Sequence, residues 1–186
     1  MGPRLETTII DDDGVIVVAS ESAPRAHYVD HSFDYEFPNA LLEGMRAGEP
    51  FAWRTGSEGE HHVSVEIVSD DAFAESGSEG TPDHVLIIGE DDALLVLPYS
   101  RFTFGCDNGA EFDLRDGLGA RTRVPATAYR VRVMCVGQNA ERGSSFRLLL
   151  CASTIARPSS AIMDLPGWHD LRDMIVTSGF RCAEDE

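Results

Sequence analysis

The segment from Arg121 to Ser153 constrains the fold most, because its pattern is that of one long β-hairpin. Side chains alternate along the first arm, 128–136, so that Arg130 and Arg132 lie opposite a row made of Tyr129, Val131, Val133 and Cys135. The second arm, 145–153, alternates in the same way and groups Phe146, Leu148, Leu150 and Ala152. Alternation with a period of two predicts strands with one face in a core and one face in water. The polar connection 137–144, which is bounded by glycines, predicts the turn.

Two further hairpins are predicted from turn residues that separate apolar runs. Residues 7–10 and 15–19 flank an Asp-Asp-Asp-Gly turn, and Asp-Gly favours a tight turn because glycine accepts a positive φ. Residues 85–88 and 94–97 flank a second acidic turn. The unbroken apolar runs of this second pair predict strands that are covered on both faces or central in a sheet.

Shorter runs complete a predicted all-β chain. Strands are predicted at 27–37, 51–55, 62–68, 101–104 and 110–114. The alternation is cleanest in 62–68, where valines and an isoleucine share the inner face. Roughly nine short strands separated by turn signals predict a mostly β protein, an antiparallel β-sandwich or jelly roll.

Two short helices are predicted to accompany the strands. The first spans 38–48, where Leu41 and Met45 are four residues apart and a glycine ends the helix. The second spans 164–179, with Asp164 as its N-cap and an apolar face directed at the strands.

We expect residues 1–186 to form a single domain. Residues 1–157 are predicted to form the sandwich, the C-terminal helix packs on it, and residues 180–186 fray. Residues 69–83 are predicted to form a loop, long enough to be either mobile or functional.

Composition limits the location and the cysteine chemistry. No run approaches 18 apolar residues and the first residues lack the apolar core of a signal peptide, so a cytoplasmic protein without a membrane span is expected. Four cysteines occur without a CxxC pair, which argues against a zinc knuckle or a redox motif. Cys135 and Cys151 lie on the two arms of the main hairpin, where a cross-strand disulfide is geometrically conceivable. A reducing compartment favours two buried thiols instead.

Charge is divided unevenly along the chain. Residues 1–100 hold 4 arginines and 21 acidic residues, a net charge of −17, whereas residues 101–186 hold 11 of each. No lysine occurs. The codon usage of a GC-rich genome explains this most simply, and selection for bidentate pairing of arginine with carboxylates is the alternative. Such acidity disfavours nucleic acids and anionic membranes, which require a cationic surface, and favours a basic protein partner.

Acidic residues are concentrated in the segment Thr55–Ser100, which holds 11 of them and no Lys or Arg. A solvated surface that keeps the protein soluble is the simpler interpretation. The functional interpretation is an electrostatic patch for a cationic partner. The predicted partner-binding residues are Glu58, Glu60, Asp70, Asp71, Glu75, Glu79, Asp83, Glu90, Asp91 and Asp92.

No motif for catalysis or for a cofactor occurs, so we expect no cofactor and no metal, and the balance is against an enzyme. A cupin-like metal site needs His-x-His, whereas His61 and His62 are adjacent and point to opposite faces of a strand. The alternative function is a jelly-roll metal-dependent enzyme or small-ligand binder that uses His31, His61 or His62. The run Asp11–Asp13 lacks the ligand spacing of an EF-hand loop, so a solvated turn is expected there.

The main hairpin also carries a family resemblance. It rests on Val124-Pro-Ala-Thr-Ala-Tyr-Arg-Val-Arg-Val133, which follows a Trp-bearing strand and an acidic turn. This layout resembles that of small bacterial β-sandwich proteins, the competence-associated inhibitors of secreted nucleases, although Ala128 stands where those proteins usually have glycine. The resemblance implies a protein inhibitor of a nuclease or toxin, and it transfers no individual site residue.

These observations together predict a non-enzymatic, acidic interaction module. Its partner is expected to be a basic protein such as a nuclease or toxin, which it binds as an inhibitor or immunity-type factor. A structural or assembly subunit, in which one sheet face pairs with copies of itself, is a further alternative.

Overall fold

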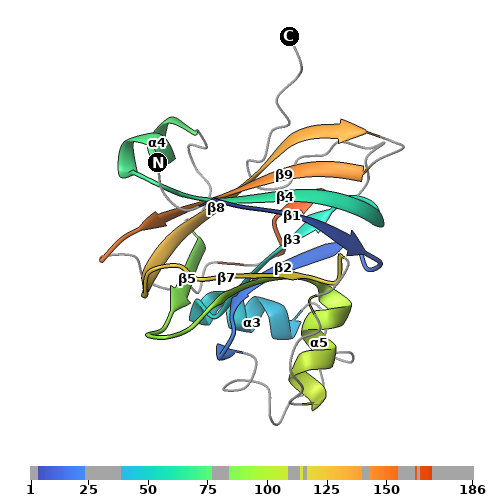
Figure 1. Cartoon of the computed structure of the whole chain (residues 1–186), viewed down its shortest axis with the longest axis horizontal. Helices are drawn as coiled ribbons and strands as arrows, with labels where there is room; N and C mark the ends of the chain where they lie inside the picture. Colours follow the sequence, from blue (N-terminus) through green and yellow to red (C-terminus); the bar gives the residue numbers. More distant parts are fainter. Residues whose placement is uncertain are drawn as a thin grey trace.

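Two five-stranded sheets pack face to face (Figure 1). The computed structural model describes residues 4–23, 39–76, 84–108, 114, 117–139, 143–154, 162 and 164–168. Sheet A has the strand order β1-β4-β9-β8-β5, and sheet B has the order β10-β3-β2-β6-β7. The predicted mostly β sandwich is therefore confirmed.

The elements have the following bounds. Sheet A contains β1 (Arg4–Asp11), β4 (Gly59–Val68), β5 (His84–Ile88), β8 (Thr127–Asn139) and β9 (Gly143–Ala152). Sheet B contains β2 (Val15–Ser20), β3 (Pro50–Thr55), β6 (Leu94–Pro98), β7 (Ala120–Thr122) and β10 (Gly167–Trp168). The helices are α3 (Asn39–Ala47), α4 (Asp70–Glu75) and α5 (Tyr99–Asn108).

The main hairpin is confirmed as β8 and β9, which lie side by side in sheet A. Its predicted inner row is buried, except that Ala152 is exposed at the end of β9. A disulfide between Cys135 and Cys151 is the wrong interpretation, because both thiols are free. The strand register aligns Cys135 with Phe146 and Cys151 with Arg130, so the two thiols point to opposite faces of the sheet.

The two other predicted hairpins are wrong in their pairing. β1 pairs with β4 in sheet A, while β2 pairs with β3 and β6 in sheet B. Likewise β5 pairs with β8 in sheet A and β6 with β2 in sheet B. Both acidic turns therefore carry the chain from one sheet to the other. The sandwich is also not wholly antiparallel, since β4 runs parallel to β9 and β10 parallel to β3.

The aromatic core joins the two sheets. Trp53 of sheet B is fully buried, and its ring centroid lies 5.8 Å from that of Phe146 in sheet A, in an edge-on contact. Phe51 stacks on Trp53 from the same strand. Rings in this arrangement add about 0.5–1.5 kcal/mol beyond the burial of their surface.

Helix α3 is confirmed, with Leu41 and Met45 buried against sheet B and Gly48 following at φ +81°. Helix α5 replaces the predicted extended segment 101–104. It packs on β2 and β6, and its buried Phe102 and Thr103 follow Tyr99 at helical spacing.

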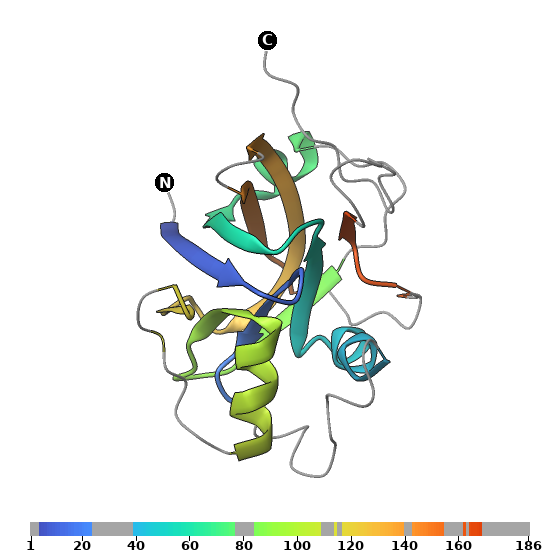
Figure 2. The same ribbon diagram turned by 90° about the vertical axis from the view of Figure 1, so that its right-hand side faces the viewer.

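Helix α4 begins at N-cap Ser69 within the predicted loop 69–83, and it lies over sheet A on the side of the molecule opposite to α3 and α5 (Figures 1 and 2). The start of the predicted C-terminal helix is also different, because Gly167–Trp168 forms strand β10. The remainder of that helix, the predicted strand 27–37 and most of 110–114 lie outside the described residues. No helix in the described part of the chain is both long and apolar enough to cross a bilayer.

Candidate functional site

The predicted partner-binding residues fall into three places on the described structure. Glu58 and Glu60 lie where β3 leads into β4, and the second group, Asp70, Asp71 and Glu75, lies on α4. Glu90, Asp91 and Asp92 form the turn between β5 and β6. Glu79 and Asp83 lie outside the described residues.

These three groups do not form one continuous patch. The ten residues of β4 separate the first group from α4, and a strand of this length spans about 30 Å. The turn between β5 and β6 lies low in Figure 1, where α4 lies at the upper left. Glu60 and α4 share one surface, however, because both lie on the side of sheet A that faces away from sheet B.

Asp92 serves the fold rather than the surface. Its carboxylate accepts hydrogen bonds from the hydroxyl groups of Ser20 and Ser22, and from the Ser22 amide at 3.2 Å. Burial by itself would raise the pKa of Asp92, but these hydrogen bonds outweigh burial and lower it. We therefore assign Asp92 a structural role, because its carboxylate joins the turn between β5 and β6 to the end of β2.

Helix α4 is held on sheet A by an aromatic side chain between arginines. Phe73 is buried, and the guanidinium groups of Arg130 and Arg132 lie 4.8 and 4.3 Å from its ring centroid. Arg132 Nη1 also donates to the Phe73 carbonyl and to Ser76 Oγ, both at 2.6 Å. These contacts fix the backbone of α4 and leave its remaining side chains exposed, so that Asp71 and Glu75 face solvent.

Some acidic residues on this side of sheet A are paired with arginines. Asp70 pairs with Arg130, Glu6 pairs with Arg4 at 2.6 Å, and Glu66 pairs with Arg147 at 2.6 Å and with Arg4 at 3.5 Å. Among the described residues, no arginine lies within ion-pair distance of Glu60, Asp71 or Glu75. These three carboxylates are therefore the ones available to an external cation.

We define the outer face of sheet A as the outward side chains of β1, β4, β9 and β8 together with α4. The strand register arranges its outward side chains in rows that cross β1, β4 and β9. The rows are Thr8–His62–Ser145, Glu6–Ser64–Arg147 and Arg4–Glu66–Leu149.

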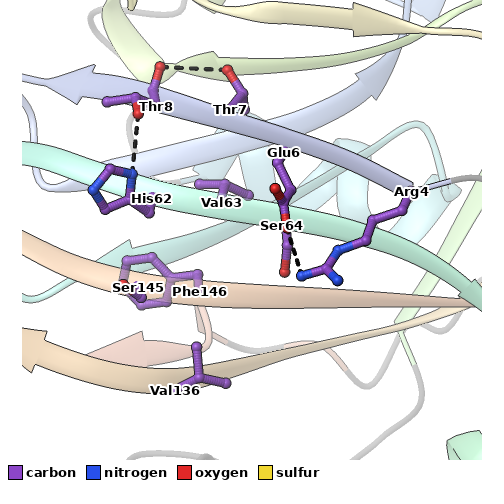
Figure 3. A pocket seen from close by; sticks show the side chains of 10 residues that line it. All are labelled: Arg4, Glu6, Thr7, Thr8, His62, Val63, Ser64, Val136, Ser145 and Phe146. Atoms are coloured by element: carbon purple, nitrogen blue, oxygen red, sulfur yellow. Dashed lines mark hydrogen bonds and ion pairs between the residues drawn. The ribbon is translucent and has the colours of Figure 1, made fainter.

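Members of these rows line a hollow of about 550 Å³ beside β1, namely Arg4, Glu6, Thr8, His62, Ser64 and Ser145 (Figure 3). Thr8 Oγ1 and His62 Nδ1 are hydrogen-bonded at 3.1 Å, while the hydroxyl groups of Ser64 and Ser145 bond to no other described residue. Val136 is 40% exposed at the rim, where a β-bulge interrupts β8. The hollow thus offers hydroxyl and imidazole groups in a shallow, open setting.

The two adjacent histidines point to opposite sides of β4, as predicted. His61 is fully buried, with Nδ1 accepting from the Ser144 amide at 3.1 Å and Nε2 donating to the Ser57 carbonyl at 3.0 Å. Burial lowers the pKa of His61, and hydrogen bonds and the charge of Asp11 only partly oppose that effect. Because both ring nitrogens are already bonded to backbone groups, His61 has no nitrogen left for a metal, and His31 lies outside the described residues.

The run Asp11–Asp13 is only partly the solvated turn that we predicted. Asp11 is buried and accepts from Thr55 Oγ1 at 2.9 Å, whereas Asp12 and Asp13 are exposed and accept from the Ser100 hydroxyl and amide at 2.7 and 2.8 Å. The three carboxylates lie within 4.8 Å of one another. Burial and then the charge of Asp12 raise the pKa of Asp13. The run caps the first turn of α5, which accounts for these side chains structurally.

Sequence reasoning missed two features of this site. One is the clamp of Arg130 and Arg132 on α4, although Ser69 followed by two aspartates is a helix-start signal in the sequence. The other is the hollow beside β1, which depends on the pairing of β1 with β4 and of β4 with β9. No local signal in the sequence specifies that pairing.

Comparison with known proteins gives a fold-level likeness. No family model matches the chain, and no curated protein matches it. One similar solved structure is ComJ from Bacillus subtilis, an inhibitor of the DNA-degrading activity of NucA, with 7% identity over 82% of this chain and 99% of that chain and a TM-score of 0.45. Another is the product described as crocagin biosynthetic gene J, with 12% identity over 81% of this chain and 96% of that chain and a TM-score of 0.47.

Proposed function

We propose that the protein is a non-enzymatic interaction module that binds a basic protein through the outer face of sheet A. In this proposal it acts as an inhibitor or immunity-type factor for a partner such as a nuclease or toxin. The observation that carries the proposal is the seating of α4, where two arginines fix the helix through Phe73 and leave Asp71 and Glu75 in solvent.

Electrostatics support a cationic partner. The chain has a formal net charge of −17, and Glu60, Asp71 and Glu75 on the outer face have no arginine partner among the described residues. Attraction between opposite surface charges accelerates association and is screened by salt, with a Debye length of about 8 Å at physiological ionic strength. Binding to such a partner should therefore weaken as salt rises.

The test is capture of partners from a lysate of the source organism at low and at high salt. Glu60→Arg combined with Glu75→Arg reverses charge near both ends of the outer face. The matched control combines Glu43→Arg on α3 with Glu90→Arg in the turn between β5 and β6, which makes the same change in net charge elsewhere. Asp91 is left unchanged because its φ of +61° would strain a substituted residue.

We expect the E60R/E75R variant to lose a basic partner that wild type and the E43R/E90R control both retain at low salt. A partner held equally by both double variants would contradict the assignment to the outer face. A partner retained equally at low and high salt would contradict the electrostatic basis of the binding.

A further inference from the structure

Strand β1 lies at the edge of sheet A, and the direction of its backbone groups follows from one hydrogen bond. The Ile10 amide donates to the Gly117 carbonyl at 2.9 Å, so it points away from β4. In an antiparallel ladder this direction repeats every second residue. The backbone N–H and C=O groups of Thr8, Glu6 and Arg4 therefore also point away from β4, toward the open side of the strand.

Side-chain distances agree with this assignment. Residues whose backbone groups point away from each other stand closest across an antiparallel pair, at about 4.5 Å between Cα atoms. Thr8 and His62 form such a pair and are joined by a side-chain hydrogen bond, and Arg4 forms an ion pair with Glu66 directly opposite. Within the described residues, no backbone group pairs with the open side of β1 before Ile10.

This edge is only partly protected against strand addition. Native sheets protect their edges with charged side chains, proline, bulges or a covering segment. Strand β1 carries the charged pair Arg4 and Glu6, but it has no proline and its register with β4 is regular over eight residue pairs. Among the described residues, the contact of Gly117, which lies in a turn, covers only the end of the strand.

We propose that β1 binds an extended segment of the basic partner, which adds to sheet A as a sixth strand. This inference rests on the proposed function. Added strands gain affinity from main-chain hydrogen bonds and specificity from alternate side chains. Every second side chain of the added strand would lie on the outer face, beside the hollow that Thr8, His62 and Ser145 line.

The charges at this position favour basic residues at those alternate positions. The outward side chains of β1 and β4 include three carboxylates, Glu6, Glu60 and Glu66, and one guanidinium group, Arg4. β9 contributes Arg147, so the three strands together retain one net negative charge. Glu6 is 67% exposed, lies nearest the open edge and pairs with Arg4 at 2.6 Å, so a cationic side chain of the added strand would compete with Arg4 for this carboxylate.

Amide hydrogen exchange of the free protein tests the direction of the edge. We expect fast exchange at Glu6 and Thr8, whose amides face solvent, and slow exchange at Leu5 and Thr7, whose amides pair with β4. Equal protection of all four amides would overturn the proposal, because the edge would then already be occupied.

Binding is tested by NMR titration with a capped octapeptide of alternating Arg and Val. We expect saturable shifts of the Glu6 and Thr8 amides. Thr8→Pro removes the edge amide and no bond to β4, and should weaken binding by roughly tenfold, as loss of about one hydrogen bond predicts. Thr8→Ala, the matched control, loses the same side chain but keeps the amide, and should bind more tightly than Thr8→Pro. Glu6→Pro with Glu6→Gln as its control repeats the test if thermal melting shows that Thr8→Pro disturbs the fold.

Two outcomes separate this inference from the proposed function. If the Arg-Val peptide binds T8P and wild type equally and is lost in E60R/E75R, strand addition is overturned and the acidic interface stands. If a Ser-Val octapeptide binds β1 as well as the Arg-Val peptide does, strand addition stands and the preference for a basic partner fails. Absence of any β1 shift at millimolar Arg-Val peptide also overturns strand addition.

Discussion

His61 is a residue whose type invites a catalytic or metal-binding interpretation and whose surroundings give it a structural one. Its ring links the connection after β3 to the start of β9 through two backbone hydrogen bonds. The neutral ring satisfies both partners, since one nitrogen accepts and the other donates. Protonation of Nδ1 would remove the acceptor for the Ser144 amide.

The stability of the protein should therefore depend on pH through His61. Its pKa is lowered by burial in the folded state, so the unfolded chain takes up a proton at higher pH. The contribution is fully present above the unfolded value of about 6.5, and it is lost as the pH falls from there toward the folded-state pKa. Urea unfolding near neutral pH and at mildly acidic pH should show a larger loss of unfolding free energy for wild type than for His61→Gln.

The exposed neighbour is the control for this prediction. His62→Gln should follow wild type, because His62 lies on the outer face. Equal losses of stability in wild type and His61→Gln would contradict the role assigned to the buried ring.

Two glycines of the main hairpin make a matched pair. Gly143 has a φ of +77°, and a Cβ placed there would lie 1.6 Å from the Glu60 carbonyl oxygen, whereas a Cβ at Gly137 meets nothing within 4 Å. Gly143→Ala should cost about 3 kcal/mol of unfolding free energy or more, from backbone strain and the clash with β4. Gly137→Ala should change it by about 0.5 kcal/mol or less, which urea denaturation can measure. Similar costs at both sites would show that β4 and β9 approach each other less closely than described.

At the scale of elements, α4 is predicted to act as a cover over Cys151. Phe73 packs with Leu149 and Cys151, and the Cys151 thiol is buried beneath the helix. Burial raises the pKa of this thiol, hydrogen bonding to Asp70 adds to that effect, and Arg130 opposes it. The thiol of the native protein should therefore react slowly with alkylating reagents.

Phe73→Ala should release this cover. The substitution removes the apolar anchor and both cation–π contacts, a loss of about 3 kcal/mol or more for a buried phenylalanine. Cys151 should then react faster with iodoacetamide, while Cys135 in the main core stays protected. Peptide mass spectrometry measures the alkylation of each cysteine over time. Phe73→Leu keeps most of the packing and should stay close to wild type. Unchanged reactivity of Cys151 in Phe73→Ala would mean that α4 does not cover it.

The elements also show what a sequence can specify. The alternation in 128–136 correctly predicts which side chains of β8 face the core. It does so because one side of β8 lies in the apolar core, whereas the other side carries the arginines that contact α4. The motif that carries the family resemblance has a local structural explanation, since the Tyr129 hydroxyl donates to the Pro125 carbonyl at 2.7 Å. Tyrosine used in this way fixes a corner of a sandwich.

Pairing between distant strands was the part that the sequence did not predict. The turns at Asp11–Gly14 and at Gly89–Asp92 have hairpin sequences, yet each carries the chain between sheets. The sequence of α5 has weak helical propensity. The helix forms because Phe102 fills the core and because Asp12 and Asp13, in the turn between β1 and β2, accept hydrogen bonds from Ser100. Both results depend on contacts between residues far apart in the chain.

At the scale of the whole molecule, folding redistributes the uneven charge of the chain. Among the described residues, three acidic residues of the first hundred pair with arginines of the remainder, in Glu21–Arg121, Glu66–Arg147 and Asp70–Arg130. Exposed ion pairs of this kind contribute at most about 1 kcal/mol each. In the proposed interface, these pairs leave Glu60, Asp71 and Glu75 as the unpaired carboxylates among the described residues of the outer face of sheet A.

The same partition explains which predicted acidic residues enter the proposal. Asp92 is used within the fold, and Glu90 and Asp91 lie in a turn away from the outer face. The sequence could locate the acidic segment but could not predict that its carboxylates lie on separate surfaces. That separation follows from the length of β4 and from the passage of the chain from sheet A to sheet B between β5 and β6.

The most direct test of the account is deuterium exchange of the protein alone and in complex with the basic partner that low-salt capture isolates. We expect binding to slow exchange in β1, at the start of β4 and in α4, and to leave α3 and α5 unchanged. Slowed exchange confined to α3, α5 or the turn between β5 and β6 would contradict it.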